Sequence, residues 1–167
     1  MSTKADLRRS EATREALSHF ARGGYDGTPV SVVSDALGVS QPYLFKLFGS
    51  KLELFIACVE YCYDSIEADA RARLDQAAAE GRAGTLDDIG EAFRSTISEA
   101  DLLRFQLQAW AASATHERIR EVVARRLHHS LELSGELTGA SADDVNDMFA
   151  RGTRLVVTTA LGFDLLR

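Results

Sequence analysis

One short run of the sequence, QPYLFK, carries side chains suited to contacts with double-stranded DNA. The amide of Gln41 can grip a base edge, and Lys46 supplies a cation for phosphate. Pro42 and Phe45 offer apolar surface of the kind that packs against thymine methyl groups, while Tyr43 adds a hydroxyl. The pattern therefore indicates a surface that reads duplex DNA.

Two short predicted helices position this run. The first begins at Thr28, its predicted cap, with Pro29 in the first turn, where the missing N–H costs nothing. A turn containing Gly38 separates it from a second helix, which Ser40 caps and which ends at Phe48. Because helices of eight or nine residues are too small to form a core, the spacing predicts a helix-turn-helix whose second helix projects outward.

Apolar contacts are expected to hold the two helices together. They join Val33, Ala36 and Leu37 of the first helix to Val39, Leu44 and Phe48 of the turn and the second helix. The alternative is an ordinary helical hairpin, in which Tyr43 and Phe45 belong to the core and Lys46 is only solvated. The exposure of the two aromatic rings separates these interpretations.

The remainder of the chain is predicted to be helical, because no proline follows Pro42. A first helix is expected from Lys4 to about Arg22, and a capping box that begins at Ser50 opens a long helix to about Glu80. The further predicted helices are Thr85–Ser98, Ala100–Ala114, His116–Leu137 and a last one that begins at Ser141. The predicted fold class is all-α.

Charge is distributed unevenly along the 167 residues. Residues 1–51 carry a formal charge of +2 and residues 52–167 one of −8, which together give the −6 of the chain. A polyanion is therefore expected to meet the N-terminal third. No apolar run approaches the length of a membrane span, and the first residues lack a secretory signal, so we expect a cytoplasmic location.

Residues that often hold metals do not form a convincing site. Cys58 and Cys62 share one side of a helix, and we expect two buried, reduced thiols because no Cys or His pair nearby in sequence would complete a tetrahedron. His128 and His129 point about 100° apart, so they do not chelate one ion. No phosphate-binding glycine loop, nucleophile elbow or HExxH motif occurs. We therefore predict no metal, no cofactor and no enzymatic activity.

The segment Thr28–Lys51, TPVSVVSDALGVSQPYLFKLFGSK, resembles the TetR family of homodimeric repressors. The resemblance lies in the Gly-Val-Ser turn, in the end of the second helix at Phe48, and in the Ser-Lys pair that starts the next helix. Two positions depart from the family, because Phe45 and Leu47 stand where a Tyr and a His commonly hydrogen-bond phosphate.

The resemblance implies roles for individual residues. Gln41, Pro42 and Tyr43 would face bases, while Thr28 and Lys51, at helix N-termini, would hold phosphate. The full predicted DNA-binding set is Thr28, Ser40, Gln41, Pro42, Tyr43, Phe45, Lys46 and Lys51. The resemblance also implies two domains: a DNA-binding domain over residues 1–51 and a ligand-sensing and dimerisation domain over residues 52–167.

A recognition helix of this length contacts few base pairs, so a homodimer that reads two half-sites is expected. The predicted interface on the last two helices comprises Val123, Leu127, Leu131, Phe149, Leu155, Val156 and Phe163, with Val122, Leu137 and Leu161 beside them. The alternative is that these side chains pack within one chain.

The middle helices contain aromatic residues that suit an apolar ligand cavity. The predicted lining is Phe93, Leu103, Phe105 and Trp110, with Arg104, Gln106, Gln108 and His116 available to orient a polar group. These residues would equally fill a solid core or lie on the surface.

The sequence predicts a regulator that binds a DNA operator, most simply a repressor released by a small apolar or amphipathic effector of unknown identity. In that hypothesis an effector among the middle helices tilts residues 52–80 and changes the separation of the two recognition helices. Three alternatives stay open: an activator of the same fold, an all-α ligand carrier or adaptor without DNA binding, and an acidic helical enzyme.

Overall fold

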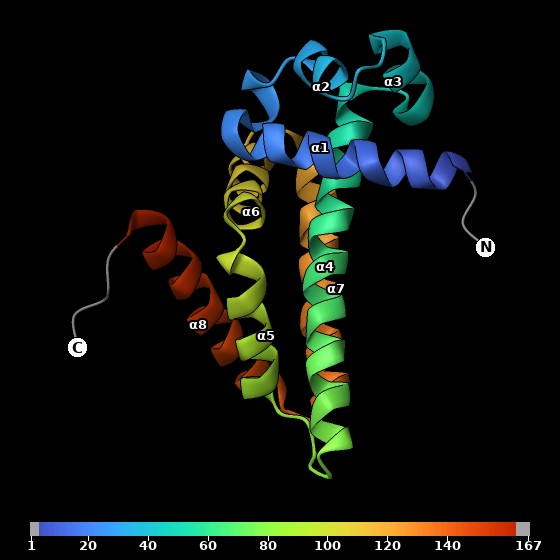
Figure 1. Ribbon diagram of the computed structural model, residues 1–167. Coiled ribbons are helices and arrows are strands. Elements are labelled where there is room, and N and C mark those ends of the chain that lie inside the picture. Colours follow the sequence, from blue (N-terminus) through green and yellow to red (C-terminus); the bar gives the residue numbers. More distant parts are fainter. Residues whose placement is uncertain (1–3, 163–167) are drawn as a thin grey trace. The chain divides into compact units, whose positions relative to one another are not determined.

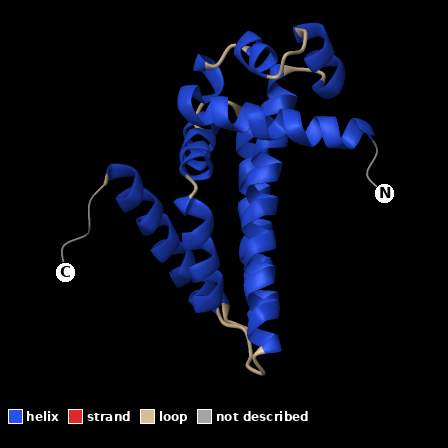
Figure 2. Ribbon diagram, in the orientation of Figure 1, coloured by secondary structure: helices blue, strands red, loops and turns tan. Residues whose placement is uncertain are grey.

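The computed structural model describes residues 4–162, which form eight helices and no strand (Figure 1, Figure 2). The helices are α1 (Lys4–Gly27), α2 (Val30–Ala36), α3 (Gln41–Phe48), α4 (Lys51–Ala79), α5 (Leu86–Ser98), α6 (Ala100–Ser113), α7 (Glu117–Thr138) and α8 (Ala142–Leu161). The predicted all-α class is confirmed. Among these described helices, none combines the length and apolar character that crossing a membrane requires.

Local hydrogen bonds begin most helices where the sequence predicts. The hydroxyl of Ser50 accepts from the backbone N–H of Glu53 at 3.1 Å at the start of α4. Thr85 and Asp88 form a reciprocal capping box at α5, and Ser141 accepts from the backbone at the start of α8. Each of these bonds joins residues three positions apart, so the local sequence is sufficient to encode it.

The first two helices differ from the prediction in detail. Although α1 extends to Gly27, Gly24 breaks it with a φ of 69° and a ψ of −179°. Pro29, not Thr28, is the N-cap of α2, and it makes no side-chain cap bond. The prediction of a Thr28 cap is wrong. The hydroxyl of Thr28 does not bond to α2 but donates to the carbonyl of His19, on α1, at 3.3 Å.

The described chain divides into two compact units. Unit 1 comprises residues 4–62 and 104–124, and unit 2 comprises residues 63–103 and 125–162. Both α4 and α7 therefore contribute to each unit. The unit that contains the helix-turn-helix is larger than residues 1–51, whose role as a separate domain stays a prediction.

Aromatic packing fills the core of unit 1. The ring centroid of Phe55 lies 4.9 Å from that of Phe20 and 5.2 Å from that of Phe105. All three side chains are fully buried. Cys58 and Cys62 are buried and form no disulfide. Burial, and secondarily the neighbouring Cys62, raises the pKa of the Cys58 thiol, which favours its protonated form.

Helices α5 and α8 lie side by side in unit 2 (Figure 1). The buried carboxylate of Asp88 is held by both guanidinium nitrogens of Arg82, at 2.7 and 2.8 Å, and by the hydroxyl of Thr85 at 2.8 Å. Arg82 and then Thr85 lower the pKa of Asp88. This cluster joins the loop after α4 to the start of α5.

We predict that Asp88→Asn destabilises the protein in a pH-dependent way. Because the folded pKa of Asp88 lies well below its unfolded value of about 3.9, its contribution to stability is full above that pH and is lost progressively as the pH falls from there toward the folded pKa. Urea unfolding should therefore show a loss of stability at pH 7 that is clearly smaller at about pH 2.5. Asp87→Asn is the matched control; an equal loss at both pH values in Asp88→Asn would contradict the assignment.

Candidate nucleic-acid interface

Capping defines α3 at both ends. Ser40, with an extended backbone, accepts from the N–H of Tyr43 at 3.3 Å, and Pro42 occupies the first turn. At the other end Gly49 has a φ of 87° and donates its N–H to the carbonyl of Phe45. A positive φ costs glycine little, so the chain turns sharply there and ends the helix.

The inward side of α3 packs as the helix-turn-helix interpretation predicts. Leu44 and Phe48 are buried, as is Val33 on α2, and α2 contacts both α1 and α3. Ala36 is exposed, so its predicted inward packing is wrong. Since Val33 and Ser34 are the buried pair of α2, Ala36 lies roughly 110° around the helix from their midpoint.

The outward side of α3 presents the predicted DNA-reading side chains. Gln41, Pro42 and Lys46 are exposed, and Phe45 retains 41% of its accessible surface. Tyr43 is half-buried, with its hydroxyl 3.5 Å from a guanidinium nitrogen of Arg8. Phe45 is therefore not a core residue, which contradicts the simple hairpin alternative.

Two residues predicted to hold phosphate are engaged elsewhere. Thr28 is only 4% exposed, so its side chain does not reach a phosphate at the surface, and the predicted side-chain contact is absent. The ammonium of Lys51 lies 3.4 Å from the carbonyl of Asp26 and 5.0 Å from the ring centroid of Tyr25. Lys51 thus joins the start of α4 to the end of α1.

The structure adds two residues that the sequence interpretation missed. Arg8 and Arg9 are exposed on α1, and both reach α3. Arg9 donates to the carbonyl of Leu47 and lies over the ring of Phe48, 4.4 Å from its centroid. The adjacent pair of arginines near the N-terminus was the only sequence signal for this contact.

The residues predicted for a dimer interface divide into two groups. Val123 and Val156 are buried within the chain, so their side chains pack inside one subunit. They do not present surface to a second copy. Leu127, Leu131, Phe149 and Leu155 are half-buried, and Phe163 lies outside the described residues. Large apolar side chains that remain exposed on α7 and α8 are Leu137, Val157 and Leu161.

The residues predicted to line a ligand cavity are not gathered at one site. Phe105 is fully buried against Phe55 and belongs to the core, and Leu103 is also buried. Phe93 and Trp110 are half-buried. Phe93 and Leu103 belong to unit 2, whereas Phe105 and Trp110 belong to unit 1.

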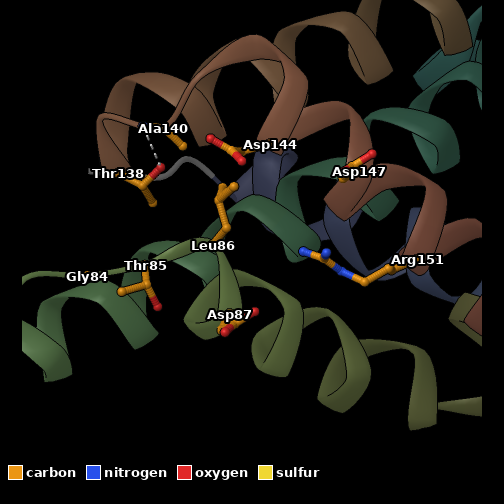
Figure 3. Close-up of a pocket in the computed structure, with 9 residues that line it drawn as sticks. All are labelled: Gly84, Thr85, Leu86, Asp87, Thr138, Ala140, Asp144, Asp147 and Arg151. Atoms are coloured by element: carbon orange, nitrogen blue, oxygen red, sulfur yellow. Dashed lines mark hydrogen bonds between the residues drawn. The ribbon is translucent and has the colours of Figure 1, made fainter.

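A pocket of about 310 Å³ lies elsewhere in unit 2 and contains none of these residues (Figure 3). Its lining comes from the start of α5, the end of α7 and the first turns of α8: Gly84, Thr85, Leu86, Asp87, Thr138, Ala140, Asp144, Asp147 and Arg151. The carboxylates and the guanidinium make this pocket polar, unlike the apolar cavity that the sequence predicts. Within residues 4–162 no cluster of three or more His, Cys, Asp or Glu suits a metal ion.

Comparison with known sequences agrees with the helix-turn-helix. Residues 13–58 match the family of bacterial regulatory proteins described as the tetR family. The HTH-type transcriptional activator FasR of Mycolicibacterium smegmatis is 33% identical over 69 residues, 41% of this chain and 32% of FasR. The HTH-type transcriptional repressor NicS of Pseudomonas putida is 32% identical over 75 residues, 44% of this chain and 35% of NicS. The matches thus span about a third of these relatives.

Two solved structures share the fold. A protein described as a transcriptional regulator from Pseudomonas aeruginosa PAO1 aligns with 95% of this chain and 82% of its own, with a TM-score of 0.71 and 18% identity. A protein described as a TetR-family transcriptional regulator from Rhodococcus sp. aligns with 90% and 86%, with a TM-score of 0.67 and 20% identity. Residues 13–58 are thus similar to the tetR family of bacterial regulatory proteins, in the region where the segment Thr28–Lys51 indicated the resemblance.

We predict that Ser40→Ala lowers the free energy of unfolding by about 1 kcal/mol, because α3 loses the acceptor for one of its first N–H groups. Urea denaturation without DNA measures the change. Ser40→Asp keeps an acceptor at the cap and should stay close to wild type. A Ser40→Ala protein as stable as wild type would show that the cap contributes nothing.

Proposed function

We propose that this chain is a sequence-specific DNA-binding transcriptional regulator in which α3 is the recognition helix. The observation that carries the proposal is the exposure of Gln41 at the first turn of α3 and of Phe45 and Lys46 further along it, while Leu44 and Phe48 on its inward face are buried. A helix with one face buried and a polar, cationic and aromatic opposite face has the form that helix-turn-helix proteins insert into the major groove. The family match favours a regulator over a carrier or an enzyme.

Each exposed side chain has a role in this proposal. Gln41 reads a base edge through its amide, and Pro42 and Phe45 contact thymine methyl groups. Lys46 neutralises a phosphate and replaces the phosphate contacts that Phe45 and Leu47 do not make. Tyr43 contributes its hydroxyl at the edge of this surface.

A homodimer is the second part of the proposal. An eight-residue helix contacts few base pairs, so two copies on successive half-sites, about 34 Å apart, give useful specificity. Val157 and Leu161 on α8 and Leu137 on α7 supply exposed apolar surface for such an interface. This surface replaces the buried Val123 and Val156 of the sequence prediction.

Control by a small apolar or amphipathic effector is the third part. Gln106 on α6 is only 6% exposed, and its Oε1 has no hydrogen-bond partner among the described residues. Leaving such an atom unsatisfied is unfavourable, so an effector with a donor group would gain from binding beside it. Gln106, α3 and the first part of α4 all belong to unit 1, so a movement of α4 would couple the effector to α3.

Repression relieved by the effector is the direction we propose, with activation as the second candidate. The relatives support both directions, since one is named an activator and the other a repressor.

The DNA-binding proposal predicts different effects for Gln41→Ala and Lys46→Ala. The probe is a duplex selected by the wild-type protein from a randomised pool, and fluorescence anisotropy measures its affinity over a salt series. Gln41→Ala should weaken binding by about 1–3 kcal/mol without changing the salt slope. Lys46→Ala should reduce the slope of log K against log salt by about 1.

Arg118→Ala, which removes an exposed cation from α7, serves as the control and should leave both quantities near wild type. If Gln41→Ala and Lys46→Ala both bind like wild type, α3 is not the DNA-reading element.

The dimer proposal predicts that Val157→Arg converts the protein to a monomer, because a desolvated guanidinium in an apolar interface is strongly unfavourable. Analytical ultracentrifugation measures the mass. Thr159→Arg adds the same charge two residues away, at another exposed position of α8, and should leave the dimer intact. A Val157→Arg protein that sediments as a dimer would exclude this face.

A further inference from the structure

A single side chain of α1 makes two different contacts with α3. The guanidinium of Arg9 donates to the backbone carbonyl of Leu47, and it also covers the ring of Phe48 at 4.4 Å from the centroid. Arg9 and Leu47 are 38 positions apart in the sequence. The two contacts fix both the end of α3 and the aromatic ring that anchors it.

The C-terminal end of a helix is a favourable place for this cation. The last carbonyls of a helix lack intrahelical partners, and they carry the negative end of the helix dipole. Gly49 satisfies the carbonyl of Phe45, and Arg9 satisfies that of Leu47. Since α3 has only eight residues, contacts at its last turn affect the orientation of the whole element.

Arg9 itself stands on a firmly held part of α1. Its carbonyl accepts from the hydroxyl of Thr13 at 2.9 Å, and Thr13 is buried. The carbonyl of Thr13 in turn accepts from the thiol of Cys58 on α4 at 3.4 Å. The contacts of Arg9 therefore connect the last turn of α3 to the α1–α4 core.

We propose that Arg9 is a positioning residue for DNA recognition: it sets the orientation of α3, and it is not itself a phosphate ligand. The inference rests on the proposed function of α3. Arg9 is occupied between a carbonyl and a ring, whereas Lys46 is exposed beside the reading face. A base-reading helix must be held within a small angle, so loss of Arg9 degrades sequence discrimination more than non-specific binding.

Lysine is a poor substitute for arginine at this position. The planar guanidinium donates in its plane while its face lies on an aromatic ring, but an ammonium is a compact, strongly hydrated point charge. Arg9→Lys therefore keeps the net charge and removes the geometry. This property separates positioning from phosphate neutralisation.

The experiment compares Arg9→Lys, Arg9→Gln and the control Arg14→Lys, which alters another exposed arginine of α1. Hydrogen exchange of the α3 amides is measured without DNA. Affinity is measured for the duplex that the wild type selects from a randomised pool and for a scrambled duplex, over a salt series. Thermal unfolding shows whether each variant is folded.

We expect Arg9→Lys to speed exchange in α3 by about threefold and to bind the selected duplex about tenfold more weakly, with unchanged affinity for the scrambled duplex and an unchanged salt slope. Arg14→Lys should match the wild type. Wild-type exchange and affinity in Arg9→Lys would overturn the proposal.

Phosphate binding by Arg9 gives a different result. In that case Arg9→Lys would keep the wild-type affinity, while Arg9→Gln would lower the salt slope by about 1 on both duplexes. This result would overturn the positioning role. If the wild type selects no duplex at all, the proposed function fails, and the exchange data alone then test the contact of Arg9 with α3.

Discussion

The burial of Leu44 and Phe48, on the inward face of α3, is the constraint on which the proposed DNA-reading surface depends. An eight-residue helix is not stable by itself in water, so its position must come from tertiary packing. Removing a Leu or a Phe side chain from water stabilises the fold by roughly 1.5–3 kcal/mol each, which is large against the caps at either end. Because these two residues face inward, helical geometry turns Pro42 and Lys46 toward solvent and places Phe45 on the flank, while Gln41 is exposed as the first residue of the helix.

The charge of the chain is consistent with this arrangement. The excess of acidic groups lies after residue 51, so the total of −6 says little about the surface around α3. Arg8, Arg9 and Lys46 concentrate positive charge near one short helix. Local charge, not net charge, determines where a polyanion can approach.

Sequence reasoning predicted the elements well because their signals are local. The caps at Ser40, Thr85 and Ser141 join residues three positions apart. Some predictions that depend on tertiary packing were wrong. Thr28, predicted to hold phosphate, is buried, and Val156, predicted to lie in a dimer interface, is a core residue. An apolar helix does not reveal which of its faces points inward.

The same limit applies to contacts between distant segments. The carbonyl that Arg9 reaches is a backbone group, so residue types alone do not identify it. The polar pocket between α5 and the α7–α8 turn likewise depends on how separate segments meet. The family resemblance, which rests on Thr28–Lys51, did not predict these contacts either.

Photocrosslinking from position 45 shows whether the exposed side of α3 lies against DNA in the complex. The wild-type side chain is replaced by p-benzoylphenylalanine, which keeps an aromatic ring on the exposed side of α3, and the protein is irradiated with a duplex selected from a randomised pool. If α3 reads the DNA, a covalent adduct with DNA forms from position 45 and none forms from position 118, on α7. Crosslinking from position 118 but not from position 45 would show that another surface binds DNA.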